Sequence, residues 1–216
     1  MRSLLMPLLA VLASAAIVDR IAVIVGRQVI TELQLDEELR VTAFLNRQSV
    51  IRDINSRKAA ANRLIEQLLI ESEMEVSRYP LPGEEDVNQY FDQIRSGFRA
   101  AADFSAALER YGLTEKVLKD HLALQLTTLR FIEFRFQPEI DVSEAEIQSA
   151  YERETADLRA QHSEAAPSLD ASRDSIRKAL LEERVDRALD AWLEQRRKRA
   201  NVEYQDPTLK PETHGE

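Results

Sequence analysis

The chain has 216 residues, no cysteine and a formal net charge of −9, from 29 Lys and Arg against 38 Asp and Glu. This acidity argues against general nucleic-acid binding, which requires a cationic surface, and the lack of cysteine excludes disulfides and thiolate metal sites. The length suffices for one hydrophobic core, so one domain, or one with a small appendage, is expected.

The first 15 residues have the pattern of a secretory signal peptide. Arg2 precedes an apolar run from Leu4 to Leu12, and small residues up to Ala15 form a cleavage pattern. The run is too short to cross a bilayer, which needs roughly 20 apolar residues. A buried N-terminal helix is the less favoured alternative. We therefore predict export to the periplasm and a mature chain that begins at Ala16.

Residues 18–30 predict two short strands. They are rich in β-branched side chains, and Gly26-Arg27 interrupts them where a tight turn is expected. Thr31 and Gln34 then have the spacing of a capping box, which predicts that a helix begins there.

Most of the chain after this hairpin is predicted to be helical, because apolar residues recur at spacings of three and four. Two prolines and a glycine break the pattern within residues 79–83. A short helix over about 103–111 is expected to end at Gly112, and the next helix extends from Thr114 to about Pro138.

The last third of the chain is more polar. Ser143 and Glu146 form a second capping-box pattern, which predicts a helix through Tyr151. Beyond it we predict a polar loop, a long helix, a closing strand and a disordered tail, over residues 156–172, 176–199, 201–204 and 205–216, respectively.

No motif for catalysis, metal or cofactor is found. The three histidines have no metal-site spacing, and the five glycines form no phosphate-binding loop. A serine hydrolase signature is missing as well. We therefore expect no enzymatic activity and no cofactor. The basic run over residues 196–199 fits the last turn of a helix, and a phosphate- or membrane-surface patch is the less favoured interpretation.

Clustered aromatic residues are the best candidates for a binding surface. Core packing explains many of them, but Phe136 falls on a different helix face from Phe131 and Phe134. We predict an exposed apolar groove for client polypeptides from this clustering. Its candidate residues are Tyr90, Phe91, Phe98, Phe131, Phe134 and Phe136.

Five segments in order resemble the SurA family of periplasmic chaperones. Residues 18–31 are similar to the strand-turn-strand that opens the mature family members, although Gly26-Arg27 replaces the usual turn asparagines. The other segments are the helix with Leu-Ile at 64–65, the Phe104 to Thr114 segment, the Val-Ser-x-x-Glu-Ile motif at 142–147, and the closing helix and strand over 188–204. Each motif is weak by itself, and the specificity lies in their order over nearly the whole mature chain.

The resemblance implies a mainly α, multi-helix peptide-binding domain of the SurA N-terminal or trigger-factor type, with a short N-terminal β-hairpin and a C-terminal strand. Residues 16–155 would form its chaperone core, and residues 173–204 would complete the same domain. Family members usually carry a parvulin-type prolyl isomerase domain in the interval that residues 156–172 occupy here. That interval is far too short for such a domain, so isomerase activity is not expected.

The resemblance also implies a function, namely an ATP-independent holdase for unfolded outer-membrane β-barrel proteins or other secreted proteins. No stable membrane insertion is expected. The sequence does not decide between a monomer and a homodimer. The alternative from a different class is a dedicated scaffold that binds one partner in a periplasmic complex. A degenerate peptidyl-prolyl isomerase is the less favoured third interpretation.

Overall fold

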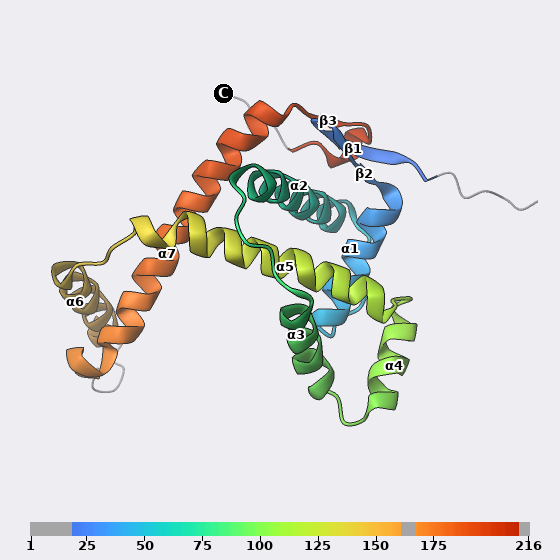
Figure 1. Cartoon of the computed structure of the whole chain (residues 1–216). Coiled ribbons are helices and arrows are strands. Elements are labelled where there is room, and N and C mark those ends of the chain that lie inside the picture. Colours follow the sequence, from blue (N-terminus) through green and yellow to red (C-terminus); the bar gives the residue numbers. More distant parts are fainter. Residues whose placement is uncertain (1–18, 161–166, 212–216) are drawn as a thin grey trace, which may run out of the picture.

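The computed structural model describes residues 19–160 and 167–211. The protein is mainly helical, with a short N-terminal β-hairpin and a C-terminal strand, as predicted (Figure 1). The predicted signal peptide, residues 1–15, lies outside the described residues. None of the helices in the described part of the chain has the length and apolar character needed to cross a bilayer.

A three-stranded antiparallel sheet joins the two ends of the described chain. Strand β1 (Ile21–Val25) lies in the centre, between β2 (Gln28–Thr31) and β3 (Val202–Tyr204). The β1–β2 turn places Gly26 at a φ of +60°, which glycine adopts without strain. A Cβ at this position would also lie 3.3 Å from the Ala200 carbonyl oxygen. The predicted tight turn at Gly26-Arg27 is confirmed, since Val25 pairs with Gln28 across it.

Helix α1 (Glu32–Leu45) begins where β2 ends. The Gln34 backbone N–H donates to the Thr31 hydroxyl at 3.3 Å, and the Thr31 N–H donates to the Gln34 side-chain oxygen at 2.9 Å. These reciprocal bonds are the predicted capping box, which fixes the boundary between strand and helix.

Four further helices complete the body. They are α2 (Ile54–Ser77), α3 (Glu84–Ser96), α4 (Ala101–Arg110) and α5 (Glu115–Arg135). One hydrophobic core lies between the sheet, α1, α2, the end of α5 and the end of α7 (Leu169–Ala200). A second core lies between the end of α1, α3, α4 and the start of α5. Helices α1 and α5 therefore connect the two cores.

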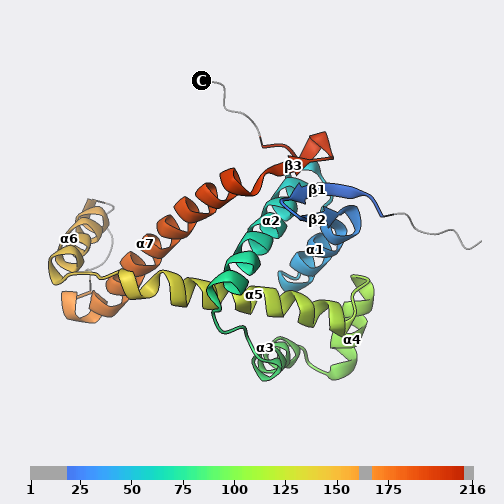
Figure 2. The same ribbon diagram turned by 45° about the horizontal axis from the view of Figure 1, so that its top comes forward.

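Helix α6 (Glu144–Ala160) pairs with the first half of α7 and stands away from the body in both views (Figures 1 and 2). A single-turn helix, η1 (Gln137–Glu139), connects α5 to this arm. A small third cluster, centred on Ile147 and Ile176, holds the pair together. The predicted loop over residues 156–172 is wrong at both ends, because the two helices extend into it. Its middle, residues 161–166, lies outside the described residues.

The prediction of a disordered tail from residue 205 is wrong for the described part of it. Residues Pro207–Leu209 form a single-turn helix, η2, against α2, and the Leu209 side chain is buried in the first core. The Asp206 carboxylate accepts a bond from Arg57 at 3.1 Å, and the Gln205 N–H donates to the Ala22 carbonyl at 2.8 Å. Residues 212–216 lie outside the described residues.

Candidate functional site

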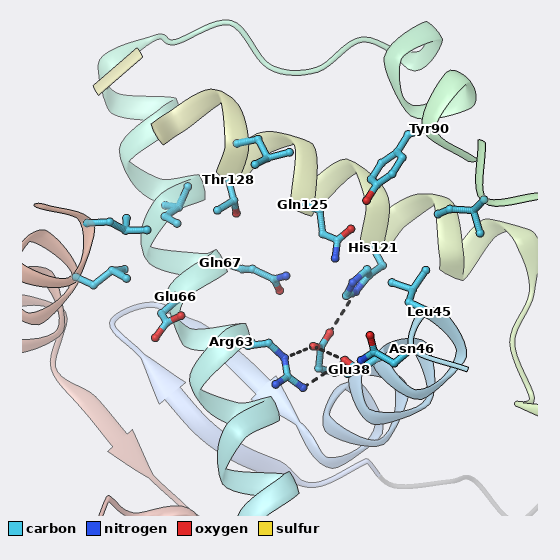
Figure 3. A pocket seen from close by; sticks show the side chains of 16 residues that line it. Glu38, Leu45, Asn46, Arg63, Glu66, Gln67, Tyr90, His121, Gln125 and Thr128 are labelled. Carbon is cyan, nitrogen blue, oxygen red and sulfur yellow. Dashed lines mark hydrogen bonds and ion pairs between the residues drawn. The ribbon is translucent and has the colours of Figure 1, made fainter. Parts of the chain in front are cut away.

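A pocket of about 710 Å³ lies where the two cores meet, between α1, α2, α3, α5 and α7 (Figure 3). We call it the central pocket. Its apolar lining consists of Leu45, Ile70, Ile94, Leu129, Leu189 and Leu193. Its polar lining consists of Glu38, Thr42, Asn46, Arg63, Glu66, Gln67, Tyr90, His121, Gln125 and Thr128. Both kinds of surface therefore face the same space.

A buried carboxylate organises the polar side of the pocket. The Glu38 side chain is only 3% exposed. It accepts a hydrogen bond from Arg63 Nε at 2.6 Å and from the Thr42 hydroxyl at 3.2 Å, and His121 Nδ1 lies 3.2 Å from its other oxygen. These contacts join α1, α2 and α5 at the pocket floor. They satisfy the rule that a buried charge needs charged and hydrogen-bonding partners.

The partners of Glu38 also determine its ionisation. Burial by itself would raise the pKa of the Glu38 carboxyl, but the hydrogen bonds from His121 and Arg63 outweigh burial and hold the pKa below its ordinary value of 4.5. The group is therefore a carboxylate at neutral pH. It anchors the floor as a fixed negative charge.

Replacing Glu38 with glutamine is expected to lower the free energy of unfolding at pH 7 by about 1–3 kcal/mol, because charge-assisted bonds to Arg63 and His121 are lost. Because the folded-state pKa is depressed, the carboxylate stabilises the fold above about pH 4.5, and this contribution is lost as the pH falls further. Urea unfolding of wild type and variant from pH 7 to pH 3 tests this. The difference between them should shrink in acid, and a constant or growing difference would contradict it.

Two buried acceptors in the pocket have no partner. The side-chain oxygens of Gln67 on α2 and Gln125 on α5 are out of contact with solvent and accept no hydrogen bond. Buried polar atoms are nearly always hydrogen-bonded, so each orphaned oxygen requires an explanation. Figure 3 shows both amides pointing into the space between α2 and α5.

The six aromatic residues predicted as a groove do not come together in one surface. Phe131 and Phe136 are buried in the first core, where Phe131 packs on Trp192 with ring centroids 4.6 Å apart. Phe91 is buried in the second core, and Phe98 packs against the same core.

Three of these six residues keep exposed surface, in different places. Phe98 is partly buried and lines a separate pocket with Phe44 and Tyr111. Phe134 is 42% exposed and stacks on Tyr79 at 6.0 Å, outside the central pocket. Tyr90 is partly buried and lines the central pocket. The predicted groove is thus split, because aromatic residues close in sequence face opposite sides of their helices. Whether Tyr90, Phe98, Phe134 or any other of the six contacts clients stays a prediction.

The basic run at the end of α7 is tied to α2. Arg196 pairs with Glu73, and Arg197 bonds Glu66 at 2.7 Å and Asn62 at 3.2 Å. Lys198 pairs with Glu194 one turn earlier in the same helix. The pairs of Arg196 and Arg197 fix α7 against α2. Two of the four cations therefore have a structural role, which weakens the interpretation of the run as a phosphate- or membrane-binding patch.

No protein-family model matches the chain, and no curated protein matches its sequence. Among residues 19–160 and 167–211, no group of three or more histidine or acidic side chains is placed to hold a metal ion. The fold and the central pocket together define a helical protein with a pocket of mixed polar and apolar character.

Proposed function

We propose that this protein is an ATP-independent periplasmic holdase that binds unfolded outer-membrane or secreted proteins in the central pocket and lacks prolyl isomerase activity. The observation that carries the proposal is the composition of this pocket. An apolar wall beside polar side chains suits a polypeptide segment, which offers apolar side chains and backbone hydrogen-bonding groups together. The resemblance of five ordered segments to periplasmic chaperones supports the same function.

The size of the pocket fits capture with easy release. Its volume of about 710 Å³ lies within the roughly 300–1,000 Å³ of sites that hold small ligands, so it takes only a short segment of a client. Each large apolar side chain that is buried contributes roughly 1.5–3 kcal/mol. Three or four such contacts, less the cost of ordering the client, give about micromolar affinity. Such a complex dissociates without ATP.

The first test follows the aggregation of an outer-membrane β-barrel protein diluted from urea, with and without the mature chain from Ala16 onward. Suppression of light scattering at near-stoichiometric amounts and without ATP is expected. No suppression by a chain that circular dichroism shows to be folded would contradict the holdase proposal. Suppression limited to one client among several unrelated ones would favour the dedicated scaffold.

A charge placed in the pocket should reduce this activity. Leu129 lines the pocket yet is 58% exposed, so Leu129→Lys is expected to leave the fold intact while placing an ammonium group where apolar client side chains bind. We expect about a tenfold loss of affinity for unfolded clients, since one large apolar contact is removed.

The matched control is Ile51→Lys. Ile51 is 57% exposed and does not line the pocket. Both variants change the surface charge by the same amount and remove an apolar side chain of the same exposure. Equal losses in the two variants, measured by fluorescence titration of one unfolded client, would show that the central pocket is not the site.

A further inference from the structure

A second pocket, of about 390 Å³, lies at the edge of the second core, beside α4 and the loop that joins α3 to α4. This end of the molecule lies away from the arm (Figures 1 and 2). The pocket shares no lining residue with the central pocket. We call it the arginine pocket, and its lining consists of Phe44, Arg47, Gly97, Phe98, Arg99, Asp103, Ala107, Arg110 and Tyr111.

The three arginines of this pocket have no acidic partner. Among the described residues, Arg47, Arg99 and Arg110 form no ion pair, and Asp103 is the single carboxylate in the lining. The chain has more acidic than basic residues, 38 against 29. Three unpaired cations around one pocket therefore depart from the composition of the whole chain, and an anion that bound there would supply the missing charge.

The backbone of Arg47 adopts a conformation that normally favours glycine. Helix α1 ends in a Schellman motif, in which the Gln48 N–H donates to the Ala43 carbonyl at 2.9 Å and the Arg47 N–H donates to the Phe44 carbonyl at 3.1 Å. Arg47 has a φ of +54°, which is unfavourable for a residue with a Cβ. Such strain persists where the surrounding structure enforces it, and it is often found at binding sites.

The side chain of Arg47 is held ready for a ligand. Its guanidinium carbon lies 5.5 Å from the centroid of the Phe98 ring, and its Nη2 donates to the Gly97 carbonyl at 3.1 Å. Phe44 packs against the rings of Phe98 and Tyr111, with centroids 5.9 and 5.7 Å apart, respectively. A guanidinium has five N–H donors, so most of them stay available, and one that is stacked on a ring loses less freedom when it binds.

The lining determines which ligand chemistry fits. Guanidinium groups match the geometry of carboxylates and phosphates, and the aromatic rings gain from contact with an apolar group. An inorganic phosphate would leave these rings in water, and a polyanion would be repelled by the net charge of −9. A peptide segment offers a carboxylate and an apolar side chain together. The volume, at the lower end of the roughly 300–1,000 Å³ of ligand sites, suits one or two side chains.

We propose that the arginine pocket binds an acidic segment of a partner polypeptide, with carboxylate oxygens on the three arginines and an aromatic side chain on the rings of Phe98 and Tyr111. This proposal goes beyond the holdase function, which is assigned to the central pocket. The chain then has two binding sites of different chemistry, both at the border of the second core.

The experiment measures fluorescence anisotropy of a labelled short peptide in which phenylalanine is flanked by glutamates, titrated with the mature chain at low salt. We expect glutamine in place of the glutamates to weaken binding about tenfold, the effect of one charge-assisted hydrogen bond. Equal affinity for the neutral peptide would overturn carboxylate recognition. Inorganic phosphate should displace the peptide no better than chloride at the same ionic strength, and stronger displacement by phosphate would show a general oxyanion site instead.

A double variant, Arg99→Gln with Arg110→Gln, assigns the binding to this pocket. We expect it to bind the acidic peptide about tenfold more weakly. The matched control is Arg20→Gln with Arg27→Gln, which removes the same charge at two exposed arginines of the N-terminal hairpin region, outside the pocket. The control should lose less than about twofold, because distant exposed charges are screened. Equal losses would show attraction by overall charge and would overturn the site.

Arg47→Gly keeps the proposal testable if the double variant fails to fold. Glycine adopts a φ of +54° without strain, so this variant is expected to fold, which circular dichroism checks. It should weaken binding of the acidic peptide about three- to tenfold. Unchanged affinity of Arg47→Gly, or no binding of the acidic peptide to the wild type, would overturn the proposal. Either result leaves the holdase function in place, since neither the peptide nor the variants involve the central pocket.

Discussion

Replacing Phe131 with alanine is expected to lower the free energy of unfolding by about 3–5 kcal/mol, the usual cost of truncating a fully buried aromatic side chain. Phe131 is 0% exposed and contacts three aromatic rings, those of Trp192, Phe136 and Tyr79. These contacts connect α5 with α7 and with the chain after α2, so the cavity left by alanine would separate several elements at once. Urea unfolding followed by circular dichroism measures the effect.

Phe134→Ala is the matched control, since the same change is made three residues later on the same helix. Phe134 is 42% exposed and has one aromatic partner, Tyr79, so its loss should cost only about 0.5–1.5 kcal/mol. Similar costs for the two variants would contradict the placement of Phe131 in the core. An unchanged stability of Phe131→Ala with lost client binding would restore Phe131 to the predicted groove.

The features that sequence predicted correctly depend on local physics. The turn at Gly26 and the capping box of Thr31 with Gln34 need only residues within a few positions of one another. The breaks between helices likewise follow from proline and glycine at 79–83. Such signals determine where elements begin and end, so the order of strands and helices could be predicted without any knowledge of their packing.

The arm shows where periodicity becomes too weak to predict structure. Helix α6 has its main contacts with α7, so a narrow apolar face suffices to hold it. Ion pairs of Glu144 with Arg173 and Arg177, and of Glu146 with Arg184, hold the two helices together. Pairs this far apart in sequence leave no local pattern, and the interval therefore resembled a loop.

The central pocket could not be assembled from sequence, because five helices contribute to it. One signal was nevertheless present. Glu38 and Gln125 occupy positions within apolar stripes, next to Leu35 and Leu39 on α1 and to Leu122 and Leu129 on α5. A polar residue at a core position either has a buried partner or faces a cavity. The predicted groove was based on the aromatic clusters instead, and most of those residues pack in the first and second cores.

The closing segment carries the last large effect, because residues predicted to be a tail complete the first core. Leu209 is 2% exposed, and η2 lies against α2 beside the ion pair of Arg57 with Asp206. Leu209→Ala is expected to lower the free energy of unfolding by about 2–3 kcal/mol, the lower part of the range for a buried leucine, since a terminal segment can partly collapse into the cavity.

Lys210→Ala is the control for this prediction. Lys210 is the exposed neighbour of Leu209, and its truncation should change the free energy of unfolding by no more than about 0.5 kcal/mol. A chain that ends at Tyr204 keeps β3 but loses both Leu209 and Asp206, so it should be destabilised at least as much as Leu209→Ala. If that shortened chain unfolds at the same urea concentration as the full one, residues 205–211 do not belong to the core. The N-terminal hairpin would then be joined to the end of the chain by β3 alone.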